Sequence, residues 1–435
     1  MEPFYSVGGV EPASSLRARR NIGPLVAGQS VSLFGDYIAF FTLPYFMLSI
    51  TGEALALGLT AFAETLPMLL FGLAAGVFLD RRRRLRRTLI GADLVRAVAF
   101  GFLAFVASPA GPDMTVRMTA VSLLAVAFLV GSMSVLFDSG LQSYMTQSLL
   151  EADLITVNTR LGLARTLALS AGPLVGGLAV TMSGGFTIAF TLNAATFIVS
   201  AFFLRLVRPI KSIAARTTER FRSAITVGLR VLFADGRLRW GTIGGTMTNF
   251  VFQPLEALLV LFVAQEILGI DNITDVASRE GLAVGSFIAI QAAIGSIGVG
   301  FAGRVARKLP LGTMYVLGLF LLGVGFFSVV LLRSWVAVIP AGIAITGVTW
   351  VNVALVTLRQ KLAPPQQMGR VIAASRTLAW AGLPAGAALG GILAGIYGIV
   401  PVYVVGSLSV IGVALFLTQT ALYRDKVMAD PRSTG

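Results

Sequence analysis

The chain contains no cysteine and no histidine among its 435 residues. It therefore has no means of forming a disulfide, of ligating haem or zinc through these side chains, or of using a Cys nucleophile or a His acid–base catalyst. Transition-metal transport is disfavoured for the same reason. A Gly-x-x-x-x-Gly-Lys-Ser/Thr loop is also missing, so ATP drive is not expected. We expect no metal site and no cofactor.

Charge is scarce as well, since 12% of the residues are charged whereas 56% are hydrophobic. A soluble globular chain carries about 25% charged residues, so the composition excludes an ordinary water-soluble enzyme. It also excludes a disordered or nucleic-acid-binding chain, because both need low hydrophobicity. What remains is an integral membrane protein whose surroundings are the lipid bilayer.

Apolar runs between polar breaks predict twelve transmembrane helices, because one span needs about 20 apolar residues. The predicted spans are 22–50, 55–79, 88–107, 116–138, 159–182, 186–206, 241–264, 281–302, 312–332, 335–357, 371–395 and 399–422. The first twenty residues lack an apolar run, so we expect no cleavable signal peptide. The predicted fold class is all-α integral membrane.

The basic residues predict how these spans are oriented. Of 34 Lys and Arg residues, Arg117, Arg279 and Arg333 fall in connections on one side, and nearly all the others fall on the opposite side. Because Lys and Arg concentrate in cytoplasmic loops, we expect both termini in the cytoplasm. The same bias explains the net charge of +14 without a nucleic-acid partner.

A basic segment, 207–240, separates the first six predicted spans from the last six. Its partly amphipathic pattern predicts one or two short helices along the inner membrane surface. The resulting domains are an N-terminal tail (1–21), an N-terminal six-helix bundle (22–206), a cytoplasmic basic linker (207–240), a C-terminal six-helix bundle (241–422) and a C-terminal tail (423–435).

The two halves contain an internal repeat. Residues 165–168 and 376–379 both read Arg-Thr-Leu-Ala, and each is followed at the same distance by a proline, Pro173 or Pro384. A chance match of four residues is the alternative, but the shared proline position favours duplication. Duplicated six-helix halves are typical of transporters in which two bundles rock about a central site.

The end of the second span and the connection after it contain Gly76, Asp80 and Arg81, followed by further arginines. It resembles the signature loop of the major facilitator superfamily, although Arg83 stands where many members have Gly or Asp. A second motif in the fifth span, made of Gly172, Pro173, Gly176 and Gly177, resembles the antiporter motif of this superfamily. The resemblance implies close packing between spans 5 and 8 that seals the cavity against proton leakage.

Three further segments, 33–36, 92–96 and 369–371, are similar to the macrolide-efflux branch of drug:proton antiporters. With them, the resemblance covers nearly the whole chain. It implies the major facilitator fold, with twelve helices in two pseudo-symmetric six-helix bundles, and a location in the bacterial cytoplasmic membrane. The substrate does not follow from the fold.

The resemblance also implies a cytoplasmic gate, which we assign to Asp80, Arg81, Asp93, Arg96 and Arg376. Asp80 ends the second span where the N-terminus of span 11 lies in this family, and such a contact is worth about 0.3–1 kcal/mol. Two alternatives stay open: the arginines serve only as topology charges, and Asp93 with Arg96 forms a local ion pair three residues apart.

Three acidic residues, Asp36, Glu64 and Glu256, lie within predicted spans and have no basic residue nearby in the sequence. A charge in the bilayer centre costs about 2.5–3.5 kcal/mol on insertion scales, so such residues usually have a function. Proton binding, attraction of a cationic substrate and structural burial are the alternatives. We favour Asp36 as the proton-coupling residue, with Glu64 and Glu256 next.

Five aromatic and polar side chains within the predicted spans are candidates for lining an apolar substrate cavity. They are Tyr37, Phe250, Phe252, Gln253 and Trp350. Packing in the core or against lipid is the alternative for each of them.

We therefore predict a proton-coupled secondary exporter, an antiporter of amphipathic or cationic small molecules, that is not an enzyme and that acts as a monomer. Export of one endogenous compound, such as a siderophore or a lipid, is the alternative. A membrane sensor or enzyme is a more remote one, because His, Cys and a soluble catalytic domain are missing.

Overall fold

The computed structural model describes residues 12–80, 85–210, 221–270, 280–364 and 367–428, and within these ranges the chain is helical with no strand. The first half contains α1 (Pro12–Thr51), α2 (Ala54–Asp80), α3 (Leu85–Val106), α4 (Val116–Ser148), α5 (Glu151–Ser183) and α6 (Thr187–Leu206). The second half contains α7 (Phe221–Ala234), α8 (Gly236–Ala257), α9 (Leu259–Phe262), the π-helix η1 (Val263–Ile267), α10 (Gly281–Lys308), α11 (Leu311–Leu332), the 3₁₀ helix η3 (Trp335–Ala337), α12 (Val338–Leu362), α13 (Met368–Tyr397), α14 (Ile399–Thr418) and α15 (Ala421–Arg424).

In the described residues, eleven helices are long and apolar enough to cross a membrane, and the number becomes twelve if α8 and the helix after it form one bent span. The prediction of an all-α membrane protein is confirmed. The seventh predicted span, 241–264, is not one straight helix, because the chain bends by 45° between Ala257 and Leu259. Pro254 lies one turn before the bend. Because proline has no N–H to donate within the helix, it accounts for the bend at this place.

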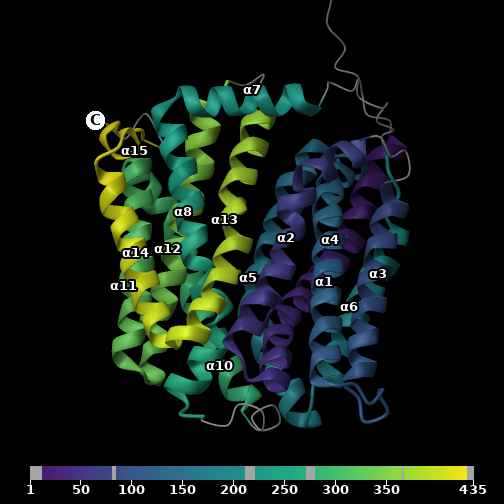
Figure 1. Ribbon diagram of the computed structural model, residues 1–435. Helices are drawn as coiled ribbons and strands as arrows, with labels where there is room; N and C mark the ends of the chain where they lie inside the picture. Colours follow the sequence, from purple (N-terminus) through teal and green to yellow (C-terminus); the bar gives the residue numbers. More distant parts are fainter. Residues whose placement is uncertain (1–11, 81–84, 211–220, 271–279, 365–366, 429–435) are drawn as a thin grey trace, which may run out of the picture.

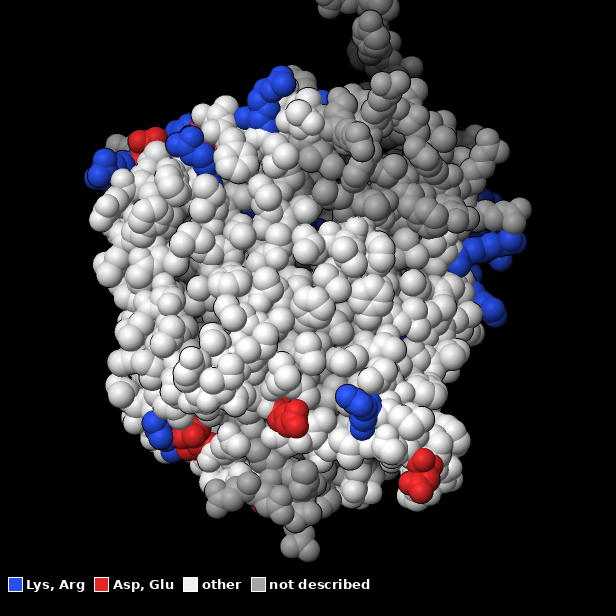
Figure 2. Space-filling model, viewed as in Figure 1, with Lys and Arg blue, Asp and Glu red and all other residues white. Residues whose placement is uncertain are grey.

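Two bundles stand side by side, α1–α6 in one and α8–α14 in the other (Figure 1). The beginning of α1 and the last described helix, α15, lie at the same end of the molecule, which we call the terminal face; the opposite end is the far face. Helix α7 lies across the terminal face, at the place where the sequence predicts a short surface helix. On the face shown in Figure 2, the middle is almost free of charged side chains, and those visible lie towards the two ends and along one side.

The two bundles contact one another closely near the far face, through helix pairs related by the internal repeat. A Cβ on Gly177 of α5 would lie 2.3 Å from the carbonyl oxygen of Gly281 of α10. A Cβ on Gly58 of α2 would lie 2.7 Å from the Cα of Gly391 of α13. Only residues without side chains allow backbones to approach this closely. The small residues of the fifth and eleventh spans therefore hold the two bundles together at this end.

The other small residues of the α5 motif pack within their own bundle. A Cβ on Gly172 would lie 2.6 Å from the Cβ of Tyr37, and Gly176 faces Phe41 and Thr42 of the same helix, α1. Pro173 instead contacts α10, since a Cβ on Gly285 would lie 2.5 Å from the Pro173 carbonyl oxygen. The predicted contact between spans 5 and 8 is thus present; its role as a proton seal stays a prediction.

Candidate functional site

Two cavities are lined by residues of both bundles, and they differ in size and chemistry. The larger one, the terminal cavity, has a volume of about 330 Å³ and opens in the half of the molecule nearer the terminal face. The smaller one, the far cavity, has a volume of about 40 Å³ and lies beside the close contacts near the far face. That volume holds only a few water molecules at most.

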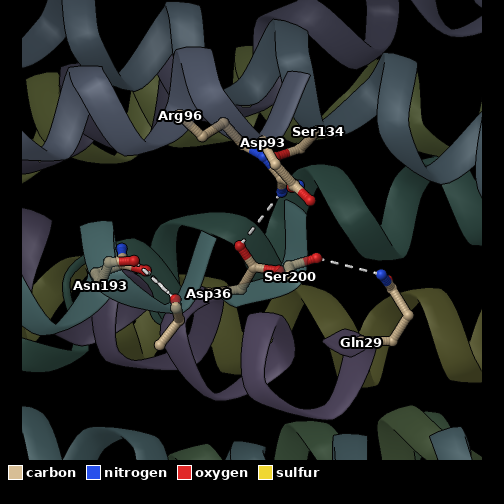
Figure 3. Close-up of polar contacts among 8 residues, drawn as sticks. Gln29, Asp36, Asp93, Arg96, Ser134, Asn193 and Ser200 are labelled. Carbon is tan, nitrogen blue, oxygen red and sulfur yellow. Dashed lines mark hydrogen bonds and ion pairs between the residues drawn. The ribbon is translucent and has the colours of Figure 1, made fainter. Parts of the chain in front are cut away.

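Asp36 lines the terminal cavity, with 39% of its side chain exposed. The structure gives it a cationic neighbour that its own helix does not supply, because Arg96 Nη1 of α3 lies 3.7 Å from Asp36 Oδ1 (Figure 3). Arg96 also donates a hydrogen bond and forms an ion pair to Asp93, one turn earlier in the same helix. One guanidinium therefore stands between two carboxylates that come from different helices.

Arg96 is almost completely buried, with 2% of its side chain exposed, and aromatic rings help to hold its charge. Its guanidinium carbon lies 4.6 Å from the ring centroid of Phe137 and 4.3 Å from that of Phe197. Its Nη1 also donates to Ser134 Oγ at 3.4 Å. Cation–π contacts and an ion pair together compensate for the loss of water around a buried guanidinium. This cluster lies inside the N-terminal bundle.

Glu64 and Glu256 both line the far cavity, although they belong to different bundles. Glu64 comes from α2, and Glu256 is the second-last residue of α8, directly before the bend. In the part of the chain that the structure describes, neither carboxylate has a Lys or Arg nitrogen within 4 Å. Apart from Gln253, the remaining side chains around them are apolar or aromatic, among them Phe40, Phe41 and Ile288. Two acidic groups thus share one small, cation-free space between the bundles.

The two arginines of the internal repeat, Arg165 of α5 and Arg376 of α13, both line the terminal cavity. Asp138 of α4 lines it too, so that the cavity carries charges of both signs. The guanidinium carbon of Arg376 lies 4.1 Å from the ring centroid of Trp380, which fixes its direction. Arg376 also borders a cavity of about 60 Å³ within the C-terminal bundle.

The five side chains predicted to line a substrate cavity do not meet in one place. Gln253, which is 7% exposed, lines the far cavity, and Phe252 lines the cavity within the C-terminal bundle. Phe250 lies in an apolar surface groove of α8, α13 and α14. Trp350 donates to the Gly298 carbonyl oxygen at 3.3 Å, and Tyr37 packs edge-on against Phe40.

The predicted gate residues are separated in the same way. Asp93 and Arg96 lie in the buried cluster beside Asp36, and Arg376 lies in the terminal cavity. Asp80 is the last residue of α2, but its side chain and the whole of Arg81 lie outside the described residues. The gate therefore stays a prediction.

Other side chains of the site carried no recognisable sequence signal. Ser134, Phe137 and Phe197 surround Arg96 from α4 and α6, and no spacing in the sequence connects them to α3. A serine or phenylalanine in an apolar span is ordinary packing by default, so only the three-dimensional arrangement identifies them.

Comparison with known proteins gives consistent results. Residues 25–384 match the family described as Major Facilitator Superfamily. Macrolide efflux protein A of Streptococcus pyogenes is 23% identical over 378 residues, which cover 85% of this chain and 88% of that protein. The multidrug efflux pump Tap of Mycolicibacterium fortuitum is 27% identical over 237 residues, which cover 52% of this chain and 55% of Tap.

Solved structures resemble the fold over almost its full length. The crystal structure of a bacterial homologue of the iron transporter ferroportin in an inward-facing state has a TM-score of 0.70 and 16% sequence identity. The similarity covers 92% of this chain and 99% of that one. At this identity the similarity concerns the fold.

Proposed function

This chain belongs to the Major Facilitator Superfamily and is a multi-pass membrane transporter rather than an enzyme, and we propose that it exchanges protons for amphipathic or cationic small molecules. The direction is export, in line with the efflux function named for its relatives. The membrane is the bacterial cytoplasmic membrane. The two bundles of one chain enclose both cavities, so a monomer is a sufficient transport unit.

The observation that carries proton coupling is the pair of Glu64 and Glu256 in the far cavity. Two ionised carboxylates in one small cavity without a cation repel each other, and their burial is costly. A proton, or the positive group of a substrate, removes this cost and lets the bundles close. Because each bundle contributes one carboxyl group, movement of the bundles changes the distance between the two charges. Their protonation is thereby linked to the conformational change.

The cluster of Asp36, Asp93 and Arg96 is a second proton-binding candidate. If both acids are ionised, the cluster has one more negative than positive charge, so binding of one proton would make it neutral. Asp36 is the member that reaches the terminal cavity, where a proton or a substrate would arrive. Its three members all lie in the N-terminal bundle, so the cluster does not sense bundle movement directly.

We propose that the terminal face is cytoplasmic, as the distribution of Lys and Arg predicts. The described conformation, with its larger cavity near this face and close contacts near the far face, is then inward-facing. Since the chain has no native cysteine, single-cysteine variants test the orientation directly. A membrane-impermeant maleimide should label Glu53→Cys in intact cells and Arg230→Cys only after permeabilisation. The reverse pattern would refute the orientation.

The transport proposal is tested with purified protein in liposomes. An imposed pH gradient should drive uphill movement of a macrolide or a cationic dye by the parent protein. Glu64→Gln and Glu256→Gln should each reduce this flux by about tenfold or more, as expected when a coupling of a few kcal/mol is removed. Glu53→Gln, which changes an exposed glutamate outside the cavities, is the matched control and should keep the parental flux.

Three results are informative. Full gradient-driven flux in both glutamine variants, combined with loss in Asp36→Asn, would move the coupling to the Arg96 cluster. Full flux in all three variants would contradict proton coupling through these acids. Gradient-driven movement of none of the drugs or dyes would favour an exporter dedicated to one endogenous compound.

A further inference from the structure

A groove rich in arginine lies on the terminal face of the N-terminal bundle, away from both cavities. We call it the arginine groove; its volume is about 600 Å³. It is lined by Leu85, Arg86, Arg87, Tyr144, Gln147, Arg205, Arg208 and Pro209. The start of α3, the end of α4 and the end of α6 with the residues after it form its walls. Blue side chains project from the side of the molecule where α3 and α6 run (Figure 2).

The walls of the arginine groove are held by hydrogen bonds to the backbone. Arg86 Nη1 donates to the carbonyl oxygens of Arg205 at 3.4 Å and Val207 at 3.3 Å. The buried Tyr144 hydroxyl also donates to the Val207 carbonyl oxygen, at 2.8 Å. Asn21 donates to the Arg208 carbonyl oxygen at 2.7 Å and accepts from the Arg208 N–H at 3.0 Å. The groove is therefore a fixed part of the fold.

Its charge is uncompensated within the described part of the chain. No Asp or Glu is among the residues that line the groove, and none of the four guanidinium groups there has a carboxylate within 4 Å among the described residues. Arg86 is occupied with carbonyl oxygens, whereas Arg87, Arg205 and Arg208 present their side chains outward. Arginine binds phosphate in a bidentate manner, so three such groups around one groove favour a phosphate ligand.

The position of the groove indicates where that phosphate comes from. Arg87 continues, at helical spacing, an exposed apolar stripe of α3 that includes Leu94, Val98 (73% exposed), Phe102 and Phe105. A similar stripe on α6, with Ile198, Phe202 and Leu206, ends beside Arg205. Residues three and four positions apart share one helix face, so the arginines and the apolar side chains form continuous surfaces. An acyl chain could lie along such a stripe while its head group reaches the arginines.

We propose that the arginine groove binds the head-group phosphate of an anionic phospholipid, whose acyl chains lie along the exposed faces of α3 and α6. Basic pockets between transmembrane helices at the cytoplasmic side are suited to such head groups. The site is independent of the two transport cavities, because none of its lining residues is shared with them.

The test measures lipid retained by the purified full-length protein after exchange into mixed micelles of phosphatidylglycerol and phosphatidylcholine. The parent protein should retain phosphatidylglycerol preferentially. The triple variant Arg87→Gln/Arg205→Gln/Arg208→Gln should lose about tenfold or more of this preference. A matched triple variant at the end of α10, Arg304→Gln/Arg307→Gln/Lys308→Gln, removes the same charge elsewhere and should keep it.

Unchanged preference in the Arg87 triple variant would overturn the proposal, and so would equal loss in the α10 triple variant. If the first triple variant does not fold, Arg87→Gln alone should lower the preference severalfold, and no loss would likewise overturn it. Inorganic phosphate and glycerol phosphate serve as soluble competitors. If either one displaces the lipid at an equal phosphate concentration, the groove is a site for soluble phosphate and the lipid proposal fails.

Discussion

Asp93 of the Arg96 cluster and the two acids of the far cavity, Glu64 and Glu256, are all carboxylates within membrane helices, but their surroundings differ. Asp93 is paired with a buried guanidinium of its own helix, whereas Glu64 and Glu256 line one cavity without a cation in the described structure. A pair within one bundle is unchanged when bundles move as rigid bodies. The distance between two groups on different bundles does change when the bundles move. We therefore expect the Arg96 cluster to stabilise the fold, and the far cavity to couple protonation to the movement of the bundles.

The largest expected effect comes from breaking the Arg96 cluster. Arg96→Met would leave Asp93, which is fully buried, without its cation. Removal of one partner of a buried ion pair costs about 3–5 kcal/mol, so the variant should unfold at a much lower temperature in detergent. Thermal unfolding of the purified protein is the measurement.

The control for this prediction removes both charges. Asp93→Asn/Arg96→Met should recover a large part of the lost stability, because no unpaired charge stays buried. In the far cavity, removal of a single charge should not destabilise the protein. Glu256→Gln removes a repulsion between two carboxylates, so its unfolding temperature should equal that of the parent or exceed it. If Arg96→Met is as stable as the parent, the ion pair has no structural role and the comparison fails.

A second prediction concerns the close contact between the two bundles near the far face. Gly177→Ala would place a Cβ 2.3 Å from the Gly281 carbonyl oxygen, so α5 and α10 would have to move apart. Overpacking of this kind costs about 1–3 kcal/mol. The conformation that is closed at the far face should become less populated. Ile288→Cys, which places a cysteine in the far cavity, should therefore react faster with a water-soluble maleimide when Gly177→Ala is present than when Gly177 is retained.

The same helix offers a matched control. A Cβ on Gly162 of α5 would meet nothing within 4 Å, so Gly162→Ala tests the replacement without the clash. This variant should be neutral or slightly stabilised, because alanine is favoured over glycine in a helix by up to about 1 kcal/mol. Equal maleimide reactivity in the two variants would show that the α5–α10 contact does not control access to the far cavity.

The sequence predicted the parts of this fold that depend on local patterns. Long apolar runs identify the membrane helices directly, and the two helices that contain the repeated Arg-Thr-Leu-Ala segments, α5 and α13, each contact the opposite bundle. The bend after Ala257 was missed, because Pro254 lies within an apolar run that continues on both sides. A proline alone does not say whether a membrane helix bends or breaks.

The candidate site was predictable only residue by residue. Each intramembrane acid is visible in the sequence, because charge is rare in such segments. Their neighbours are not: Asp36 lacks a basic residue on its own helix face, yet Arg96 of α3 lies 3.7 Å away. Glu64 and Glu256 belong to different halves of the chain, and no spacing connects them. Pairing across helices is set by packing, which a single sequence does not contain.

The smallest expected effect is at a carboxylate–arginine pair outside the membrane spans, which sharpens the contrast with Asp93 and Arg96. Asp235 caps α8 by accepting from the N–H groups of Arg237 and Leu238, and its Oδ2 lies 2.7 Å from Arg237 Nη2. These hydrogen bonds, led by the one from the Arg237 side chain, lower the pKa of Asp235 below its ordinary value of 3.8. The cap therefore stabilises the fold above about pH 4, and this contribution is lost as the pH falls through the lowered pKa.

Because water screens this partly exposed pair, most of its value comes from the cap. Asp235→Ala should cost about 1 kcal/mol at pH 7, well below the cost of Arg96→Met. Asp235→Asn keeps a capping oxygen and loses the charge, so it should fall between the parent and the alanine variant. Unfolding temperatures at pH 7 and pH 3 provide the measurement, and the difference between parent and Asp235→Ala should shrink at the lower pH. A cost at Asp235 as large as that at Arg96 would mean that burial does not set the strength of these pairs, and the distinction between the two kinds of site would lose its physical basis.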